Sequence, residues 1–232
     1  MIPPVSQTVT TPYYQDSLVT IYLCDSRLIL PTLHFDVVVT DPPYGMAYRS
    51  NSATVYRPEG DRMVRTSSPT DAIGGDDSPE LRDWLLRTWH GPALVFGTWR
   101  VRRPPCRQLI VWDKGDSPGM GDLSLPWGPS HEEIYVIGEG FAGPRTGSVI
   151  RVQAYSATDA DRPEHPTPKP PALMIKLLEK CPPEWVICDP FLGSGATLVA
   201  AKLLGRHAVG IEIEEKWAAE AARRCGQGVL GL

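Results

Sequence analysis

The stretch that decides the fold is Trp185-Val186-Ile187-Cys188-Asp189-Pro190-Phe191-Leu192-Gly193-Ser194-Gly195, near the carboxyl end of the 232-residue sequence. Its first four residues are apolar, as in a strand covered on both faces, and the glycines that follow favour a turn. Residues 196–204 are rich in alanine and leucine and predict a helix that ends at Gly205. Another apolar run, 208–213, comes next. The segment therefore predicts a strand, a glycine turn, a helix and a second strand.

Short apolar runs of the same kind recur upstream and alternate with helical patterns. We expect strands at 19–24, 35–40, 93–97, 108–112, 133–137, 185–188 and 208–213. Helices are expected after Ser78-Pro79, at 172–180 with Thr167-Pro168 at its start, at 196–204 and at 214–224. This alternation predicts an α/β fold, with a mostly parallel seven-stranded sheet and helices on both faces.

Length and composition predict one compact domain over 1–232, with irregular segments at 46–77 and 138–164. The apolar runs are too short to cross a bilayer, and no secretory signal is visible, so we expect a cytoplasmic protein. The five cysteines form no C-x-x-C pair, and no metal site is expected.

The net charge of −4 argues against a general attraction to polyanions, but basic residues cluster locally. A cluster of this kind is more often a solvated face than a nucleic-acid site. Candidate DNA-contacting residues are Arg49, Arg57, Arg62 and Arg65 in one segment and Arg100, Arg102, Arg103 and Lys114 in another.

The expected strand 35–40 runs directly into Asp41-Pro42-Pro43-Tyr44. Consecutive prolines end a central strand, so this turn should lie at the carboxyl edge of the sheet, where ligands bind in open α/β folds. The Asp41 carboxylate and the Pro42 carbonyl can each accept one N–H of an exocyclic amine, and the Tyr44 ring can stack on a base turned out of a duplex. The alternative is a proline-stiffened turn with an ordinary buried tyrosine.

The glycine turn after residue 188 suits a nucleoside. Glycines allow the backbone to approach a ligand closely where helix-terminal N–H groups point. The next expected strand ends near Glu212, whose carboxylate can bind a ribose diol. Strand, turn, helix, strand and acid in this order are more specific than the glycines alone.

Together these motifs resemble the β class of DNA amino-methyltransferases, in which the catalytic motif precedes the cofactor motif. Asp41, Pro42, Pro43 and Tyr44 are similar to the catalytic motif of that class, and residues 191–195 are similar to its F-x-G-x-G loop. Residues 165–170, His-Pro-Thr-Pro-Lys-Pro, resemble its H-P-T-x-K-P segment. The resemblance covers residues 19–224 and implies a circularly permuted, Rossmann-like methyltransferase fold.

The resemblance also implies a cofactor, S-adenosylmethionine, which leaves as S-adenosylhomocysteine. Thr167 and Lys169 would hold its methionine part. Asp25 would lie near its adenine, although Cys24 stands where the family usually has glycine. The cofactor residues implied are Asp25, Thr167, Lys169, Asp189, Pro190, Phe191, Gly193, Ser194, Gly195 and Glu212.

The activity implied is methylation of adenine N6 in duplex DNA, because Asp at position 41 is commoner in adenine enzymes and Ser in cytosine-N4 enzymes. Cytosine N4 remains an alternative. So do an RNA or protein substrate, whose enzymes usually have Asn at this position, and an inactive cofactor-binding subunit.

The chain has no room for a large target-recognition region, so we expect 46–77 and 138–164 to form a minimal one. The resemblance is compatible with a prokaryotic or phage enzyme of restriction–modification type and with a homodimer. It leaves a restriction endonuclease partner open.

Overall fold

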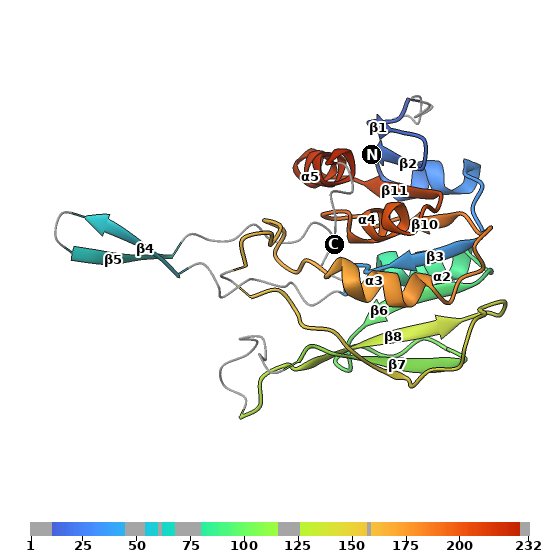
Figure 1. Cartoon of the computed structure of the whole chain (residues 1–232), viewed down its shortest axis with the longest axis horizontal. Helices are drawn as coiled ribbons and strands as arrows, with labels where there is room; N and C mark the ends of the chain where they lie inside the picture. The colour runs from blue at the N-terminus through green and yellow to red at the C-terminus, as the bar shows by residue number, and fades with distance from the viewer. Residues whose placement is uncertain are drawn as a thin grey trace.

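The computed structural model describes residues 11–44, 54–59, 62–67, 80–115, 126–156 and 159–227. Most of its strands form one nine-stranded sheet in the order β1-β2-β11-β10-β3-β6-β8-β7-β9 (Figure 1). They are β1 (Tyr14–Gln15), β2 (Val19–Leu23), β3 (Val37–Thr40), β6 (Ala93–Gly97), β7 (Gln108–Asp113), β8 (His131–Ile137), β9 (Val149–Arg151), β10 (Ile187–Asp189) and β11 (Ala208–Glu212).

The centre of the sheet is parallel, because β2, β11, β10, β3 and β6 all run the same way. Strand β8 is antiparallel to both β6 and β7, and β9 lies parallel to β7. All seven expected strands are present, which confirms the predicted α/β sheet. The two- and three-residue strands at its margins, β1 and β9, were not predicted.

Helices cover both faces of the sheet, as the sequence predicted. They are α1 (Ser26–Ile29), α2 (Glu80–Thr88), α3 (Pro171–Leu178), α4 (Ala196–Leu203) and α5 (Glu215–Gly226), with a short 3-10 helix η1 (Leu30–Thr32) after α1. Residues of α3, α4 and α5 share one buried apolar cluster with the sheet, and residues of α1 and α2 share a second. Neither α1 nor η1 was predicted.

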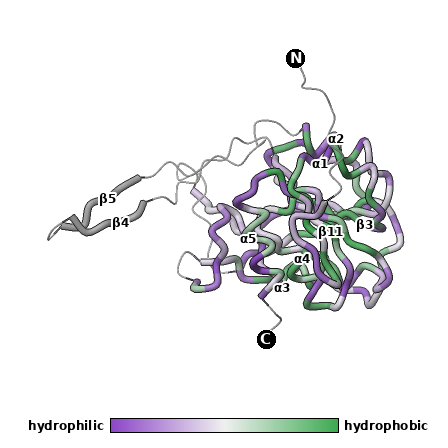
Figure 2. The backbone as a smooth tube through the Cα atoms, turned by 90° about the horizontal axis from the view of Figure 1, so that it is seen from above, coloured by the Kyte–Doolittle hydropathy of each residue, from purple (hydrophilic) through white to green (hydrophobic). Residues whose placement is uncertain are grey.

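Strand β3 shows how the two clusters are separated. Its valines are fully buried and alternate between faces, so that Val37 and Val39 join the cluster of α3 to α5 while Val38 joins the cluster of α1 and α2. In Figure 2 the trace near β3 is correspondingly apolar. A run of β-branched residues without polar alternation therefore marks a central strand.

Helix α3 begins later than the sequence predicted. The expected start at Thr167 is wrong, because the helix begins at Pro171, with Pro170 extended at its N-cap (φ −70°, ψ 134°). Each residue that precedes a proline is pushed away from the helical region, and prolines stand at 168, 170 and 171. The segment before α3 is therefore extended rather than helical, and it can cross the edge of the sheet.

Within the segment expected to be irregular, 46–77, the structure places two strands, β4 (Thr54–Glu59) and β5 (Arg62–Ser67). They pair antiparallel with each other, separately from the large sheet. Two residues, Gly60-Asp61, separate them in the sequence, a length common in hairpins. The two arginines of β5 and Pro58 within β4 concealed this pattern. No helix in the described part of the chain is long and apolar enough to span a bilayer.

Candidate active site

The carboxyl ends of neighbouring parallel strands bring the sequence motifs together. Asp41 follows β3, and the turn at 190–195 follows β10, which is hydrogen-bonded to β3. Glu212 ends β11 on the other side of β10, and the Cys24 N–H donates to the Glu212 carbonyl at 2.8 Å. The loops predicted to carry catalysis and cofactor binding therefore lie side by side at one edge of the sheet.

Asp41 lies within a chain of alternating charges at this edge. The Tyr44 hydroxyl donates to its Oδ1, and the Lys169 Nζ donates to its Oδ2. The same Nζ lies 3.2 Å from Glu132 Oε2, and Lys114 Nζ lies 2.7 Å from Glu132 Oε1. Side chains that are far apart in the sequence thus form one network, Tyr44–Asp41–Lys169–Glu132–Lys114.

Burial and charge act against each other in this network. Burial raises the pKa of Asp41, the Lys169 ammonium lowers it, and the Glu132 carboxylate raises it again, with a net upward shift. Burial would also raise the pKa of Glu132, but Lys169 and Lys114 outweigh it, and the pKa lies below its usual value. Burial and the Asp41 carboxylate hold the pKa of Tyr44 well above its usual value. Lys169 and Glu132 are therefore charged, and Tyr44 is a neutral donor.

Asp189, predicted as a cofactor residue, is tied into the protein. It is 3% exposed, and its carboxylate accepts the hydroxyls of Thr40 at 2.6 Å and Thr197 at 2.5 Å. The Phe191 N–H also donates to it, at 3.2 Å. Burial raises the pKa of Asp189 to about 6, although its hydrogen bonds act in the opposite direction. It joins the end of β3, the glycine turn and the first turn of α4.

Hydrogen bonds to the Glu212 carboxylate, and one from Arg224 of α5, hold the glycine turn in shape. Gly193 and Gly195 have φ values of +51° and +84°, in the left-handed region that favours glycine. The Gly193 N–H donates to Glu212 Oε2 at 2.8 Å, while the Ile213 and Glu214 N–H groups donate to Oε1, each at 2.9 Å. Three backbone donors thus orient this carboxylate at the turn.

Other predicted cofactor residues line the same turn. Pro190 is buried and its carbonyl accepts the Ser26 hydroxyl, while Phe191 is half-buried against the cluster of α1 and α2. Arg224 donates to the Ser194 carbonyl at 2.6 Å, from α5. Asp25 is the N-cap of α1 and accepts the Arg27 N–H at 2.9 Å. These contacts stabilise the turn.

The segment before α3 connects the two motifs, which the sequence did not indicate. At one end, His165 Nε2 lies 3.1 Å from the position that a Cβ on Gly193 would occupy, and its ring meets Trp217 edge-on at 4.7 Å. The Thr167 N–H donates to His165 Nδ1 at 3.3 Å. At the other end, Lys169 contacts Asp41. One extended segment thus spans from the glycine turn to the catalytic candidate.

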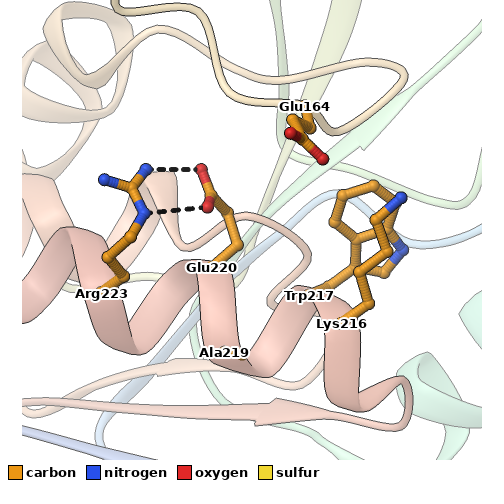
Figure 3. A pocket seen from close by; sticks show the side chains of 6 residues that line it. All are labelled: Glu164, Lys216, Trp217, Ala219, Glu220 and Arg223. Carbon is orange, nitrogen blue, oxygen red and sulfur yellow. Dashed lines mark hydrogen bonds and ion pairs between the residues drawn. The ribbon is translucent and has the colours of Figure 1, made fainter.

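Burial lowers the pKa of His165 to about 4, and the nearby charges of Lys169, Arg162 and Lys216 act in the same direction. The imidazole is therefore neutral at pH 7. Beyond it, an open depression of about 200 Å³ is lined by Glu164, Lys216, Trp217, Ala219, Glu220 and Arg223 (Figure 3). Of the charged residues that line it, Arg223 and Glu220 pair with each other.

The predicted DNA-contacting residues fall into three groups. Arg103 pairs with the buried Glu133 from an exposed position, whereas Lys114, whose side chain is largely covered, pairs with Glu132. Arg100 and Arg102 are exposed in the loop after β6, and Arg100 lies over the ring of Trp99 at 5.4 Å. Arg57 lies in β4, Arg62 and Arg65 lie in β5, and Arg49 lies outside the described residues.

Exposed aromatic residues that the sequence analysis did not single out lie at the same edge. Trp99 is 62% exposed just after β6, and Trp127 is 83% exposed just before β8. Because β8 is antiparallel to β6, the end of one and the start of the other meet at this edge. The part of the chain that the structure describes holds no group of three His, Cys, Asp or Glu side chains arranged to bind a metal ion.

Comparisons of the sequence with known proteins agree on one family. The sequence model of the N6/N4 DNA methylase family matches residues 80–223. The Type II methyltransferase M.ScaI of Streptomyces caespitosus is similar at 41% identity, in an alignment that covers 92% of this chain and 83% of that protein.

Two solved structures show the same fold. The M1.HpyAVI–SAM complex aligns with a TM-score of 0.63 at 22% identity, covering 90% of this chain and 100% of that chain. The PvuII DNA methyltransferase, described as cytosine-N4-specific, aligns with a TM-score of 0.65 at 14% identity, covering 97% and 92%.

Proposed function

Because this chain belongs to the N6/N4 DNA methylase family, we propose that it transfers the methyl group of S-adenosylmethionine to N6 of adenine in duplex DNA. The observation that carries the proposal is the adjacency of the Asp41 turn and the glycine turn, at the ends of the hydrogen-bonded strands β3 and β10. A base bound at the first turn and a cofactor bound at the second would lie next to each other.

The residues at the glycine turn fit this cofactor. The left-handed backbone at Gly193 and Gly195 shapes the turn, and Glu212 presents an oriented carboxylate beside it. A carboxylate oxygen has two lone pairs, so Glu212 can accept ribose hydroxyls in addition to the backbone N–H groups. S-adenosylmethionine supplies an electrophilic methyl group on a sulfonium. We propose that Asp25, Thr167 and Lys169 complete the site, with the Lys169 ammonium kept on the protein's own carboxylates, Asp41 and Glu132.

At the other turn, we propose that Asp41 and the Pro42 carbonyl accept the two N–H groups of the target amine. These hydrogen bonds would draw the amine nitrogen toward tetrahedral geometry and release its lone pair to form the N–C bond as the methyl–sulfur bond breaks. S-adenosylhomocysteine would leave, and the methylated nitrogen would lose one proton to solvent. Tyr44 would stack on the base once it leaves the duplex, as base-modifying enzymes require. Orientation and these two acceptors would supply most of the rate enhancement.

The choice of adenine rests on Asp41, since Asp at this position is commoner in adenine-N6 enzymes. Cytosine N4 is the second candidate, and the shared fold with the PvuII enzyme, which is cytosine-N4-specific, favours it. The two reactions need the same acceptors, so the difference lies in the fit of the base.

We propose that DNA lies across the edge carrying Arg100, Arg102, Trp99 and Trp127. Arginines neutralise phosphates, and exposed aromatic rings can stack on unpaired bases. Segments 46–77 and 138–164 would add sequence recognition.

The test incubates the purified protein with labelled S-adenosylmethionine and unmethylated duplex DNA, followed by mass spectrometry of the nucleosides. N6-methyladenosine supports the proposal, and N4-methylcytidine retains the mechanism but corrects the base. Absence of any methylated nucleoside while cofactor binds would overturn DNA as the substrate. Asp41→Ala should abolish turnover and change the cofactor Kd by less than about threefold, since Asp41 acts mainly on the amine.

A further inference from the structure

In the structure each Asp41 oxygen already accepts one hydrogen bond, and the bond to Oδ2 brings a positive charge with it. Its Oδ1 accepts the Tyr44 hydroxyl, and its Oδ2 accepts the Lys169 ammonium. The ammonium on Oδ2 also offsets the negative charge of the Asp41 carboxylate beside the amine nitrogen, which becomes positive during methyl transfer. If Asp41 binds that amine, as the proposed function requires, the developing positive charge on the amine favours movement of Lys169 away from Oδ2.

Lys169 cannot simply move into water. Its side chain is 8% exposed, and its Nζ lies 5.2 Å from the centre of the Phe96 ring. A buried ammonium that loses its carboxylate partner is strongly destabilised unless another anion receives it. Among the described residues, the only other carboxylate ion-paired with Lys169 is Glu132, whose Oε2 lies 3.2 Å from the Nζ.

Glu132 is prepared to receive this charge. Its Oε2 is buried and forms no hydrogen bond of good geometry with any described residue, although Lys169 is close. Its Oε1 is fixed by Lys114, which lies over the ring of Trp112. A buried acceptor without a hydrogen bond is costly, so a full bond from Lys169 would be favourable.

We propose that Glu132 is a positioning residue for methyl transfer: it receives the Lys169 ammonium from Asp41 when the target amine enters, and so leaves Asp41 Oδ2 open to an N–H of the amine. No proton is transferred in this exchange, because the Lys169 ammonium moves as a whole from one carboxylate to the other. This inference rests on the proposed function. It gives a role to Glu132 of β8, which lies outside both the Asp41 turn and the glycine turn.

The neighbouring residue offers a matched control. Glu133 is the next residue of β8 and faces the opposite side of the sheet, where it pairs with Arg103 and accepts the Tyr135 hydroxyl at 2.9 Å. It is 3% exposed, so Glu133→Gln also removes a buried, ion-paired carboxylate from the same strand. Glu132→Gln and Glu133→Gln should therefore disturb the fold to a similar extent and the chemistry to different extents.

The first measurement is the single-turnover rate of methylation at saturating DNA and cofactor. We expect Glu132→Gln to lower the rate about 10- to 100-fold, the loss typical of a misplaced catalytic group, with cofactor and DNA Kd values within about threefold. Glu132→Asp should recover part of the rate, and Glu133→Gln should stay within about threefold of the wild type. A Glu132→Gln rate close to the wild-type rate would overturn the proposal.

The second measurement separates this inference from the proposed function. The charged and titratable groups facing Asp41 are Lys169, Glu132, Tyr44 and, more distantly, Asp189. Because the Glu132 charge raises the pKa of Asp41, the Asp41 carboxyl, followed by carbon-13 NMR and assigned with Asp41→Asn, should titrate at lower pH in Glu132→Gln. Glu133→Gln should leave that titration unchanged.

This titration needs no substrate. If the wild type methylates no DNA but the Asp41 titration moves as expected, the function fails while the coupling of Glu132 to Asp41 stands. If the titration does not move, or moves equally in Glu133→Gln, the positioning role is overturned whatever the activity.

Discussion

The hydroxyl of Thr40 donates to the carboxylate of Asp189 at 2.6 Å, and this bond ties the residue just before Asp41 to the turn after β10. The same carboxylate accepts the Thr197 hydroxyl in the first turn of α4. The two loops of the site are therefore connected through one buried side chain. Displacing either loop would disturb hydrogen bonds to the other.

Asp189 should make the stability of the protein depend on pH. Its folded pKa of about 6 lies above the ordinary aspartate value of 3.8, so the folded state binds this proton more tightly than the unfolded state. Its contribution to the free energy of unfolding is therefore largest below about pH 4 and is lost as the pH rises to about 6, by a few kcal/mol.

Asp189→Asn should remove this dependence while keeping the geometry, since its amide can accept from one threonine and donate to the other. Urea denaturation at intervals from pH 4 to pH 7 compares the two proteins. The variant should gain stability relative to the wild type between pH 4 and pH 6 and hold a constant difference above. Parallel curves throughout would contradict the assignment.

Lys169→Met should shift the acidic limb of the activity profile upward. Burial already raises the pKa of Asp41, and the Lys169 ammonium lowers it. Without that charge the pKa of Asp41 rises further, so at a given pH more Asp41 is protonated and is a weaker acceptor for an N–H. Methylation rates measured from pH 5 to pH 9 should therefore fall off at a higher pH than in the wild type.

Lys176→Met, at an exposed position of α3, is the control for this shift. It should leave the profile unchanged. An acidic limb in Lys169→Met that coincides with the wild-type limb would show that the ionisation of Asp41 does not govern the rate.

Gly195→Ala should destabilise the protein more than Gly205→Ala. Both positions have positive φ, +84° and +66°, which costs an alanine about 1–2 kcal/mol. A Cβ on Gly195 would also lie 2.8 Å from the Ala221 Cβ, whereas nothing lies within 4 Å of one on Gly205. Chemical denaturation should show an additional loss of about 1–3 kcal/mol for Gly195→Ala, the usual cost of overpacking. Equal losses would mean that α5 yields to the added methyl group.

Replacing Arg100 and Arg102 together with alanine should weaken DNA binding and make it less dependent on salt. If each arginine neutralises one phosphate, the slope of log K against log salt should fall by about 2. Arg107→Ala is the control, because Arg107 precedes β7 at the opposite edge of the sheet, where it pairs with Glu139. An unchanged slope in the double variant, or an equal change in the control, would place the DNA elsewhere.

The sheet and the two turns could be predicted from the sequence because their signals are local. Val37-Val38-Val39 is apolar throughout, and the prolines at 42 and 43 mark where the strand stops. Strands β1 and β9 were missed because two or three residues are too few to show a periodic pattern. The start of α3 was predicted too early because a Thr-Pro pair is typical of a helix start, whereas the prolines that follow it keep the chain extended.

The network around Asp41 could not be predicted, since it depends on which loops meet. Asp41, Glu132 and Lys169 come from three separate parts of the chain, and only the strand order brings them together. Lys114 was read as a surface charge that contacts DNA, but its ammonium lies against Glu132. A sequence alone does not show whether a basic side chain is exposed to solvent or pairs with a buried carboxylate.

The order of strands has a consequence for how the protein is made. The Val186 N–H donates to the Asp36 carboxylate across 150 residues, and β3 pairs with β10 beside it. At translation rates of about 5–20 residues per second, β3 leaves the ribosome on the order of ten seconds before β10 is synthesised. Until then the nascent chain exposes one edge of β3, which invites aggregation or binding by a chaperone. The turn at Asp41 is thus made early but stays incomplete, and a chain that terminates before residue 187 would leave the edge of β3 open to proteases.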